Sequence, residues 1–249
     1  MKKKLIVEKV LGIPPDYQLK ALNSSNFLQS NWHNNKLVTL NFILQKVKPK
    51  RVLDLGTGSG NFEFKFHKKL KEIVGVDYND EAIAFLKSEL KRKRVNNVKL
   101  INWDIRKINK LTRIGKFDLI IIVDVIEHLT AFEAGKLISS LKKFLTKEGK
   151  VCVITPNYNG FWPFIEKVLD LFRLVPHMEG RQHRSKFTVR SLNHLFTKRN
   201  YYQLYFSTFN LFFPFVFFNK KLSSFVCKIE LKLRLSRGNL LIYLFEVNE

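Results

Sequence analysis

Cysteine is scarce in this chain, with only Cys152 and Cys227 among 249 residues. Two isolated cysteines cannot build a disulfide framework or a thiolate metal site. No apolar run reaches the roughly 18–20 residues that a transmembrane helix needs. The N-terminal stretch is unlike a signal peptide, because charges interrupt its short apolar run and no small-residue cleavage site follows. We therefore expect an intracellular, cytoplasmic protein.

Acidic residues are also few, since 21 Asp and Glu stand against 44 Lys and Arg, for a net charge of +23. Such a surplus favours contact with a negative partner, for which nucleic acid, an anionic membrane and a phosphorylated substrate are all candidates. A lysine-rich composition throughout would give the same surplus without any such partner, and both readings stay open. The 45% of apolar residues suffices for one large folded domain over residues 1–249.

A glycine-rich segment follows the short apolar strand predicted at Arg51–Leu55. Its pattern is D-x-G-x-G-x-G, from Asp54 to Gly60, and an amphipathic helix comes next. Glycines let the backbone turn sharply and approach a ligand closely, while the helix N-terminus points at the same place. A dinucleotide fingerprint would need its third glycine at position 61, which is Asn61. The pattern therefore indicates a nucleotide-like cofactor without a pyrophosphate.

At these residues the chain resembles the class I S-adenosylmethionine-dependent methyltransferases, and three further elements follow in the order of that family. Asp77 ends the next apolar strand, where a carboxylate can accept hydrogen bonds from ribose hydroxyls. Asp104 follows the third strand, and Phe117-Asp118 introduces the fourth. The resemblance implies S-adenosylmethionine as the cofactor. It assigns to the cofactor site Asp54, Gly56, Thr57, Gly58, Gly60, Asp77, Tyr78, Asp104, Ile105 and Asp124.

The alternation of apolar strands and amphipathic helices from Arg51 to Thr155 predicts an α/β fold with a doubly wound, mostly parallel sheet. Helices are expected at residues 26–48, 81–94 and 131–145, and a fifth strand at 149–155. If the chain follows the family, strands at 201–208 and 240–247 close this Rossmann-like sheet with an antiparallel edge. We expect an N-terminal helical cover (1–48), a cofactor-binding core (49–157), a helical lid or substrate insertion (158–187) and a C-terminal part with a Phe-rich and basic stretch (188–249).

Candidate catalytic residues come just after the fourth strand, where open α/β sheets bind ligands. In a helical turn, Asp124, Glu127 and His128 would share one face. Two carboxylates and an imidazole could bind a divalent cation such as Mg²⁺, Mn²⁺ or Zn²⁺, with a fourth ligand from elsewhere. His183 lies just before a helix that starts near Thr188. We expect the other histidines at the surface: His33, His67, His177 and His194.

The second half looks like the ubiquinone-biosynthesis O-methyltransferases, on the strength of Thr155–Gly160, the acid-x-x-Glu-His motif and the later His183. The same motif resembles the metal-dependent enzymes that 2′-O-methylate small RNA ends. There two acids and two histidines hold a metal, and the matching positions are Asp124, Glu127, His128 and His183. Both families usually have Glu where this chain has Asp124. The resemblance therefore implies Glu127, His128 and His183 as catalytic residues.

Two mechanisms stay open for this motif. Methyl transfer is an in-line displacement at an activated sulfonium, so the enzyme must position the acceptor and remove its proton. A bound cation would lower the pKa of an acceptor hydroxyl. Without a cation, Glu127 would only shape the pocket, and His128 or His183 would act as the base, since imidazole titrates near neutrality.

Two apolar segments bear on the substrate. In the predicted lid, a helix over 160–175 would place seven apolar residues on one side, and Glu166, Lys167, Asp170 and Arg173 on the other. The apolar side consists of Phe161, Phe164, Ile165, Val168, Leu169, Phe172 and Val175. The second segment, Leu211–Phe218, is followed by Lys220, Lys221, Lys228, Lys232, Arg234 and Arg237. Aromatic residues beside cations suit an anionic lipid surface, although both segments could instead be core or dimer interface.

The sequence favours O-methylation of a hydroxyl on a lipophilic or lipid-linked small molecule, and thus an amphiphilic acceptor, with peripheral contact to an anionic membrane. A metal-dependent RNA 2′-O-methyltransferase is the first alternative, and nucleic acid is the less favoured partner because no separate RNA-binding module is evident. A non-catalytic cofactor-binding module is the second. The chain is expected to be a monomer or a homodimer.

Overall fold

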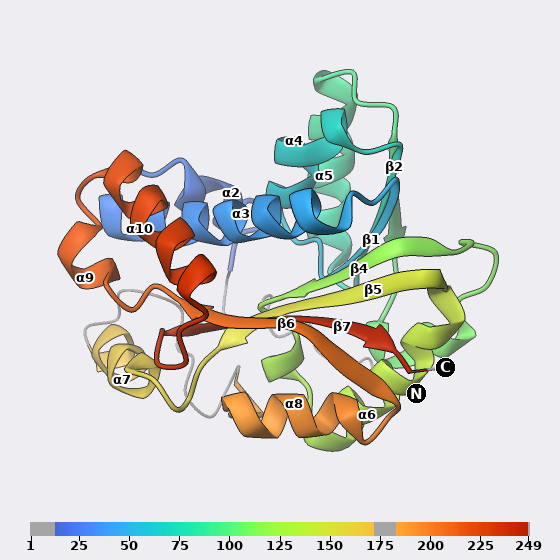
Figure 1. The fold of residues 1–249 in the computed structure, drawn as a ribbon. Helices are drawn as coiled ribbons and strands as arrows, with labels where there is room; N and C mark the ends of the chain where they lie inside the picture. Colours follow the sequence, from blue (N-terminus) through green and yellow to red (C-terminus); the bar gives the residue numbers. More distant parts are fainter. Residues whose placement is uncertain (1–12, 172–182, 249) are drawn as a thin grey trace.

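The computed structural model describes residues 13–171 and 183–248. Within these ranges seven strands form one mixed sheet in the order β3-β2-β1-β4-β5-β7-β6 (Figure 1). The first five strands run parallel, and β7 is antiparallel to both of its neighbours. The predicted fold, with its antiparallel edge, is confirmed. The strands are β1 (Arg51–Leu55), β2 (Glu72–Asp77), β3 (Val98–Asn102), β4 (Phe117–Val123), β5 (Leu145–Pro156), β6 (Tyr201–Phe209) and β7 (Leu240–Val247).

Helices cover both faces of the sheet, as Figure 1 shows for α3 and α10 on one face and α6 and α8 on the other. The longer helices are α3 (Phe27–Val47), α5 (Asp80–Arg92), α6 (Ala131–Leu141), α7 (Trp162–Leu171), α8 (Val189–Thr197) and α10 (Lys220–Leu233). The shorter ones are α2 (Tyr17–Leu22), α4 (Asn61–Phe66), α9 (Phe213–Val216) and the 3₁₀ turns η1 (His67–Lys69), η2 (Ile105–Lys110), η3 (Ile126–His128) and η4 (Lys142–Phe144).

The central strands are apolar throughout because both of their faces are buried. In β4, Ile120 and Ile122 belong to the core beneath α6 and α8, while Leu119 and Ile121 belong to the core beneath α3 and α10. Successive side chains of a strand point to opposite faces, so a strand covered on both sides reads as a continuous apolar run. All four residues are fully buried.

The predicted helix at 131–145 is too long. Helix α6 ends at Leu141, the turn η4 follows, and β5 begins at Leu145. The predicted fifth strand at 149–155 is correspondingly short, because Gly149 lies inside β5 rather than before it. The apolar residues at 144–145 are part of the sheet core, which periodicity alone could not separate from a last helical turn.

The strand order reverses between β1 and β4, whose carboxyl ends lie side by side. Open α/β sheets bind ligands at such a point. The glycine-rich segment follows β1 and the motif containing Asp124, Glu127 and His128 follows β4, so the fold brings both to this edge. No helix in the described ranges combines the length and the apolar character that crossing a bilayer requires.

Candidate active site

The glycine-rich loop after β1 has a backbone that only glycine adopts readily. Gly56, Gly58 and Gly60 have φ angles of +90°, +49° and +82°, in the left-handed region that side chains disfavour. A Cβ atom on Gly56 would overlap Val125, and one on Gly60 would overlap Leu86. The loop therefore packs tightly between the segment after β4 and helix α5.

Asp77, at the end of β2, holds this loop. Its Oδ2 accepts a hydrogen bond from Gly58 N at 2.9 Å, and its Oδ1 accepts one from Asn79 N at 2.9 Å. The Asn79 side chain in turn caps α5 by accepting hydrogen bonds from Glu81 N and Ala82 N. Asp77 therefore fixes the loop and the start of α5 together, and Tyr78 lies half-buried beside it.

A cavity brings together four residues predicted to bind the cofactor: Asp54, Gly56, Thr57 and Asp124. Its other wall is α3, which contributes His33 and Lys36. The Lys36 ammonium forms an ion pair with Asp124 Oδ2. Burial, together with the Lys36 charge, lowers the pKa of His33 to about 3, so this imidazole is neutral. The expectation that His33 lies at the surface is wrong, because α3 turns it toward the cavity.

Glu63, which was not among the predicted site residues, lies fully buried beneath the loop. Its Oε1 accepts a hydrogen bond from Thr57 Oγ1. Burial raises the pKa of Glu63 to about 7, and burial with the nearby Glu63 and Asp77 charges raises the pKa of Asp54 well above its usual range. Gly75 in β2 makes the space, since a Cβ there would lie 3.1 Å from Glu63 Oε1. The only sign in the sequence was an acid next to Phe62 on an otherwise core-facing helix.

Replacing Glu63 by glutamine should change how stability depends on pH. The pKa of Glu63 is higher in the folded state than in the unfolded state, so its ionisation opposes folding. Its contribution to the free energy of unfolding is complete below about pH 4.5 and is lost as the pH rises through about 7. Glutamine does not ionise, so the Glu63→Gln variant does not lose this stability. Its free energy of unfolding should therefore rise relative to that of the parent as the pH increases from about 4.5 to about 7. Urea unfolding at several pH values measures it, with the exposed Glu148→Gln as control; parallel curves for Glu63→Gln and the parent would refute it.

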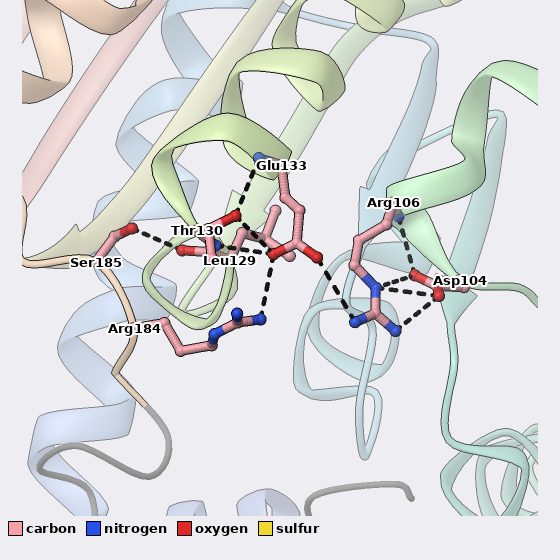
Figure 2. Close-up of polar contacts among 7 residues, drawn as sticks. All are labelled: Asp104, Arg106, Leu129, Thr130, Glu133, Arg184 and Ser185. Carbon is pink, nitrogen blue, oxygen red and sulfur yellow. Dashed lines mark hydrogen bonds and ion pairs between the residues drawn. The ribbon is translucent and has the colours of Figure 1, made fainter. Parts of the chain in front are cut away.

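Asp104 lies just after β3, and its carboxylate is engaged by Arg106 (Figure 2). Arg106 Nη2 lies 2.7 Å from Asp104 Oδ2, and Arg106 N donates to Oδ1 at 3.0 Å. Partial burial alone would raise the pKa of Asp104, but these Arg106 contacts hold it below its usual value. Asp104 also begins η2, whose first residue is the buried Ile105. Both residues thus line the β3 side of the strand ends.

Figure 2 shows how Glu133 joins this region to the segment that carries His183. The Glu133 carboxylate lies 3.9 Å from Arg106 Nη1 and 3.2 Å from Arg184 Nη1, and it also caps α6 through Thr130. Ser185 Oγ donates to the Leu129 carbonyl at 2.6 Å. Since these contacts come from three separate elements, they fix the position of residues 184–185 against the start of α6.

The segment containing His183 is also anchored directly to the motif after β4. Arg184 N and Ser185 N both donate to the Glu127 carbonyl, at 2.8 and 2.9 Å. As a result, one ligand atom from each of Glu127, His128 and His183 lies within 4.8 Å of the others. The His128 and His183 ring centroids are 5.4 Å apart. The structure thus brings together the three residues predicted to be catalytic.

Asp124 does not join this cluster, contrary to the predicted four-residue metal site. The prediction assumed one helical turn over residues 124–128, but Asp124 has a φ of +52° and only Ile126–His128 form a turn. The carboxylate is therefore directed to Lys36 in α3. Asp124 remains at the cofactor side of the site, where it was also predicted.

Glu166 on α7 is a second functional residue that sequence analysis missed. Its Oε1 lies 2.6 Å from His183 Nδ1, and both its oxygens lie 2.9 Å from Tyr158 Oη. Burial opposes protonation of His183, but the hydrogen bond to Glu166 and the nearby Glu127, Glu166 and Asp124 charges raise its pKa. Glu166 therefore orients the His183 ring and stabilises its protonated form.

The predicted orientation of the lid helix is wrong. Glu166 was expected on the outer side of α7, yet it is only 2% exposed, while Phe161 and Phe164 are 62% and 69% exposed. The inward side consists of Trp162 and Glu166, one turn apart, because Glu166 has buried partners that no local pattern reveals. The side chains of Asp170, Phe172, Arg173, Val175 and His177 lie outside the described part of the chain.

Aromatic side chains form one wall beside the cluster. The Trp162 ring centroid is 6.2 Å from His183 and 5.5 Å from Trp32, and Trp32 is 5.1 Å from Phe213. These rings come from α7, α3 and α9. The polar cluster therefore borders a packed aromatic group contributed by three helices, in which Trp162 and Phe213 are buried.

Glu127 is almost completely buried, at 1% exposure. Its Oε2 accepts a hydrogen bond from Thr155 Oγ1 at 2.9 Å, while its Oε1 has no hydrogen-bond partner among the described residues. Burial raises the pKa of this carboxyl, although His128 opposes the shift. An unpartnered buried carboxylate oxygen is costly unless a proton donor or a cation approaches it.

Two known proteins of assigned activity are similar to part of this chain. A ribosomal protein L11 methyltransferase of Lactobacillus gasseri is 35% identical over 136 residues, covering 54% of this chain and 40% of that protein. A ubiquinone biosynthesis O-methyltransferase of Coxiella burnetii is 28% identical over 145 residues, covering 56% of this chain and 59% of that protein. The chain thus spans less than two thirds of the length of either relative.

The fold is shared with a magnesium protoporphyrin IX methyltransferase from Synechocystis solved with bound S-adenosylmethionine. That structure has a TM-score of 0.61 at 12% identity, and the match covers 100% of both chains. A family described as a methyltransferase domain matches residues 46–207, which include the glycine-rich loop and the cluster around His183. The chain therefore belongs to the methyltransferase domain family.

Proposed function

We propose that this protein is an S-adenosylmethionine-dependent enzyme that methylates a hydroxyl group of a lipophilic or lipid-linked small molecule. The observation that carries the proposal is the setting of His183, whose Nδ1 is held 2.6 Å from the buried Glu166 while its ring lies beside the Trp162 wall. A base at an aromatic wall suits an acceptor that has a hydroxyl and an apolar body. The likeness to a ubiquinone biosynthesis O-methyltransferase supports the same class of acceptor.

His183, Glu166 and Tyr158 have distinct roles in the proposed reaction. Because Nδ1 of His183 is engaged by Glu166, Nε2 is the nitrogen that takes the proton from the acceptor hydroxyl. When bound, S-adenosylmethionine would supply the methyl group: the hydroxyl oxygen would gain the bond to the methyl carbon, and the sulfur would keep the electron pair of the C–S bond as a neutral thioether. The Glu166 carboxylate stabilises the imidazolium that forms, as a buried acid does for histidine in other enzymes. Tyr158 donates to Glu166 and keeps it in place.

A divalent cation of the Mg²⁺, Mn²⁺ or Zn²⁺ type is the alternative to a base in this proposal, because Nδ1 of His183 is engaged by Glu166 and a cation would occupy the same Nε2 that otherwise takes the proton. Glu127, His128 and His183 fit one, because their ligand atoms converge and Glu127 Oε1 is buried without a partner among the described residues. When bound, a cation would lower the pKa of the acceptor hydroxyl. Asp124 is not among the proposed ligands, since its ion pair with Lys36 already neutralises it.

Calorimetry with S-adenosylmethionine, with and without EDTA, tests the cofactor and the cation together. We expect cofactor binding in both conditions. If the cation replaces the base, the purified protein should hold stoichiometric metal that is lost in His183→Ala but kept in His194→Ala, where the histidine is exposed. Metal content unaffected by His183→Ala would refute the cation site. No binding of S-adenosylmethionine would refute the cofactor assignments.

Transfer assays test the acceptor class. We expect a phenol that carries a long alkyl chain to have a higher kcat/KM than the unsubstituted phenol, and mass spectrometry to find the methyl ether as product. Equal kcat/KM values for the two phenols would show that the aromatic residues beside His183 do not determine substrate specificity. N-methylation of an amine analogue at a higher rate would contradict O-methylation.

An RNA 2′-O-methyltransferase is the second candidate, favoured by the convergence of Glu127, His128 and His183 and by the net charge of +23. A protein that neutralises several phosphates binds RNA with an affinity that falls steeply with salt. Methylation of a short RNA at a terminal 2′-hydroxyl, with such a salt dependence, would replace the lipophilic acceptor. RNA binding that is absent or insensitive to salt would exclude this candidate.

A further inference from the structure

We propose that the outer faces of α9 and α10, together with the outer face of α7, form a docking surface for an anionic phospholipid bilayer. This inference goes beyond the proposed function, because it concerns where the enzyme binds rather than what it methylates. It depends on three observations: a row of exposed apolar side chains, a parallel row of cations and the position of both at one end of the molecule.

Helix α10 has a buried side and an apolar outer side. Ser223, Cys227 and Glu230 face the protein and are at most 1% exposed. The outer side carries a row of large apolar residues at helical spacing, which continues into α9 and the segments flanking it. These residues, with their exposed fractions, are Phe212 (49%), Phe215 (73%), Phe218 (58%), Leu222 (40%), Phe225 (60%), Ile229 (39%) and Leu233 (65%). Soluble monomers rarely expose contiguous apolar surface of this kind without using it.

A row of lysines runs beside this apolar row. Each of these lysines comes directly before an apolar residue of the row: Lys221 before Leu222, Lys228 before Ile229, and Lys232 before Leu233. The lysines therefore lie along one side of the apolar row on α10. All are exposed, as are Lys220, Arg234 and Arg237. The sole acid between residues 211 and 239 is Glu230, which is buried and accepts hydrogen bonds from Asn210 N and Phe212 N. The outer surface therefore presents only positive charge beside apolar groups.

The exposed residues of α7 lie at the same end of the molecule. Trp32 contacts both Trp162 of α7 and Phe213 of α9, which places the two helices next to each other. Figure 1 shows α7, α9 and α10 together at the end opposite to α5 and β2. Phe161, just before α7, and Phe164 in α7 are both exposed and thus extend the apolar surface beyond α9.

Charge decides between a bilayer and a second copy of this chain. In a dimer through this face, each set of six cations would approach its equivalent, with no exposed acid on α10 to balance it. A membrane with anionic lipids supplies the opposite charge to the lysine row and an apolar interior to the phenylalanines. The surface fits a bilayer on both counts.

Co-sedimentation of the full chain with vesicles tests this inference. The probes are phosphatidylcholine vesicles and the same vesicles with a third of phosphatidylglycerol. We expect binding only to the anionic vesicles, weakened by salt. Replacing Lys221, Lys228 and Lys232 by glutamine should weaken it about a hundredfold, and Phe225→Ser with Ile229→Ser at least about tenfold, since each removes an inserted apolar side chain.

Matched variants elsewhere on the surface control for charge and hydrophobicity. Lys68→Gln with Lys87→Gln and Lys91→Gln removes three exposed lysines from another face, and Phe132→Ser removes a phenylalanine that is 69% exposed on α6. Both should bind as the parent does, and circular dichroism should show all variants folded. Equal binding to both vesicle types, equal losses in the controls, or a dimer that dissociates in Phe225→Ser would each overturn the inference. Because the assay needs no catalysis, its result is independent of the proposed reaction.

Discussion

Replacing His183 by alanine is expected to lower kcat by roughly a hundredfold to ten-thousandfold, the range typical of losing a general base. The variant lacks the imidazole that Glu166 holds at 2.6 Å, while Gly58 in the glycine-rich loop and Asp77 at the end of β2, which shape the cofactor side, are untouched. The affinity for S-adenosylmethionine should therefore stay as in the parent. Single-turnover rates with saturating cofactor, combined with calorimetry, separate the two quantities.

His194→Ala is the matched control, because this histidine lies exposed on α8. Glu166→Gln adds a graded variant: the amide keeps the size of the side chain but cannot stabilise an imidazolium as the carboxylate does, so its kcat should fall between those of His183→Ala and the parent. A His183→Ala variant with the parent kcat would show that another group accepts the proton.

The second large effect concerns the loop backbone. Gly60→Ala should lower the free energy of unfolding by roughly 2–4 kcal/mol, since it combines a left-handed φ of +82° with a clash against Leu86, which is fully buried. The same shift of the loop should weaken cofactor binding. Urea unfolding and calorimetry measure the two effects.

Gly58→Ala provides the comparison within the same loop. A Cβ at this position would lie 2.6 Å from Gln18 Oε1, at the far end of a flexible side chain that can move away. We therefore expect the cost in stability to be less than half of that for Gly60→Ala. A larger cost for Gly58→Ala would mean that α2, rather than α5, limits the room for this loop.

The sheet and its cofactor loop could be predicted from the sequence because their signals are local. Apolar runs such as Ile120–Ile122 indicate a strand that is buried on both faces of the sheet. The spacing of the glycines indicates a loop whose backbone turns sharply. The convergence of His183 with Glu127 and His128 was implied only by the family resemblance, since these residues meet through hydrogen bonds to the Glu127 carbonyl.

The misjudged residues all owe their position to distant partners. Glu166 reads as the polar side of an amphipathic helix, and only Tyr158 and His183 bring it inward. Asp124 reads as the first residue of a helical turn, but its positive φ directs it to Lys36. A sequence pattern shows the hydrophobic periodicity of a single helix or strand. Hydrogen bonds and ion pairs between different elements can be seen only in the folded structure.

The position of β7 between β5 and β6 has a consequence for folding during translation. Among the described strands β6 pairs only with β7, although β7 is the later of the two in the chain. While a ribosome is still translating α10, β6 has no hydrogen-bonding neighbour, and aromatic residues such as Tyr205 and Phe209 have no β7 to pack against. An unpaired strand of this composition is prone to associate with other chains. We therefore expect the nascent protein to complete its sheet late in synthesis and to depend on chaperones until it does.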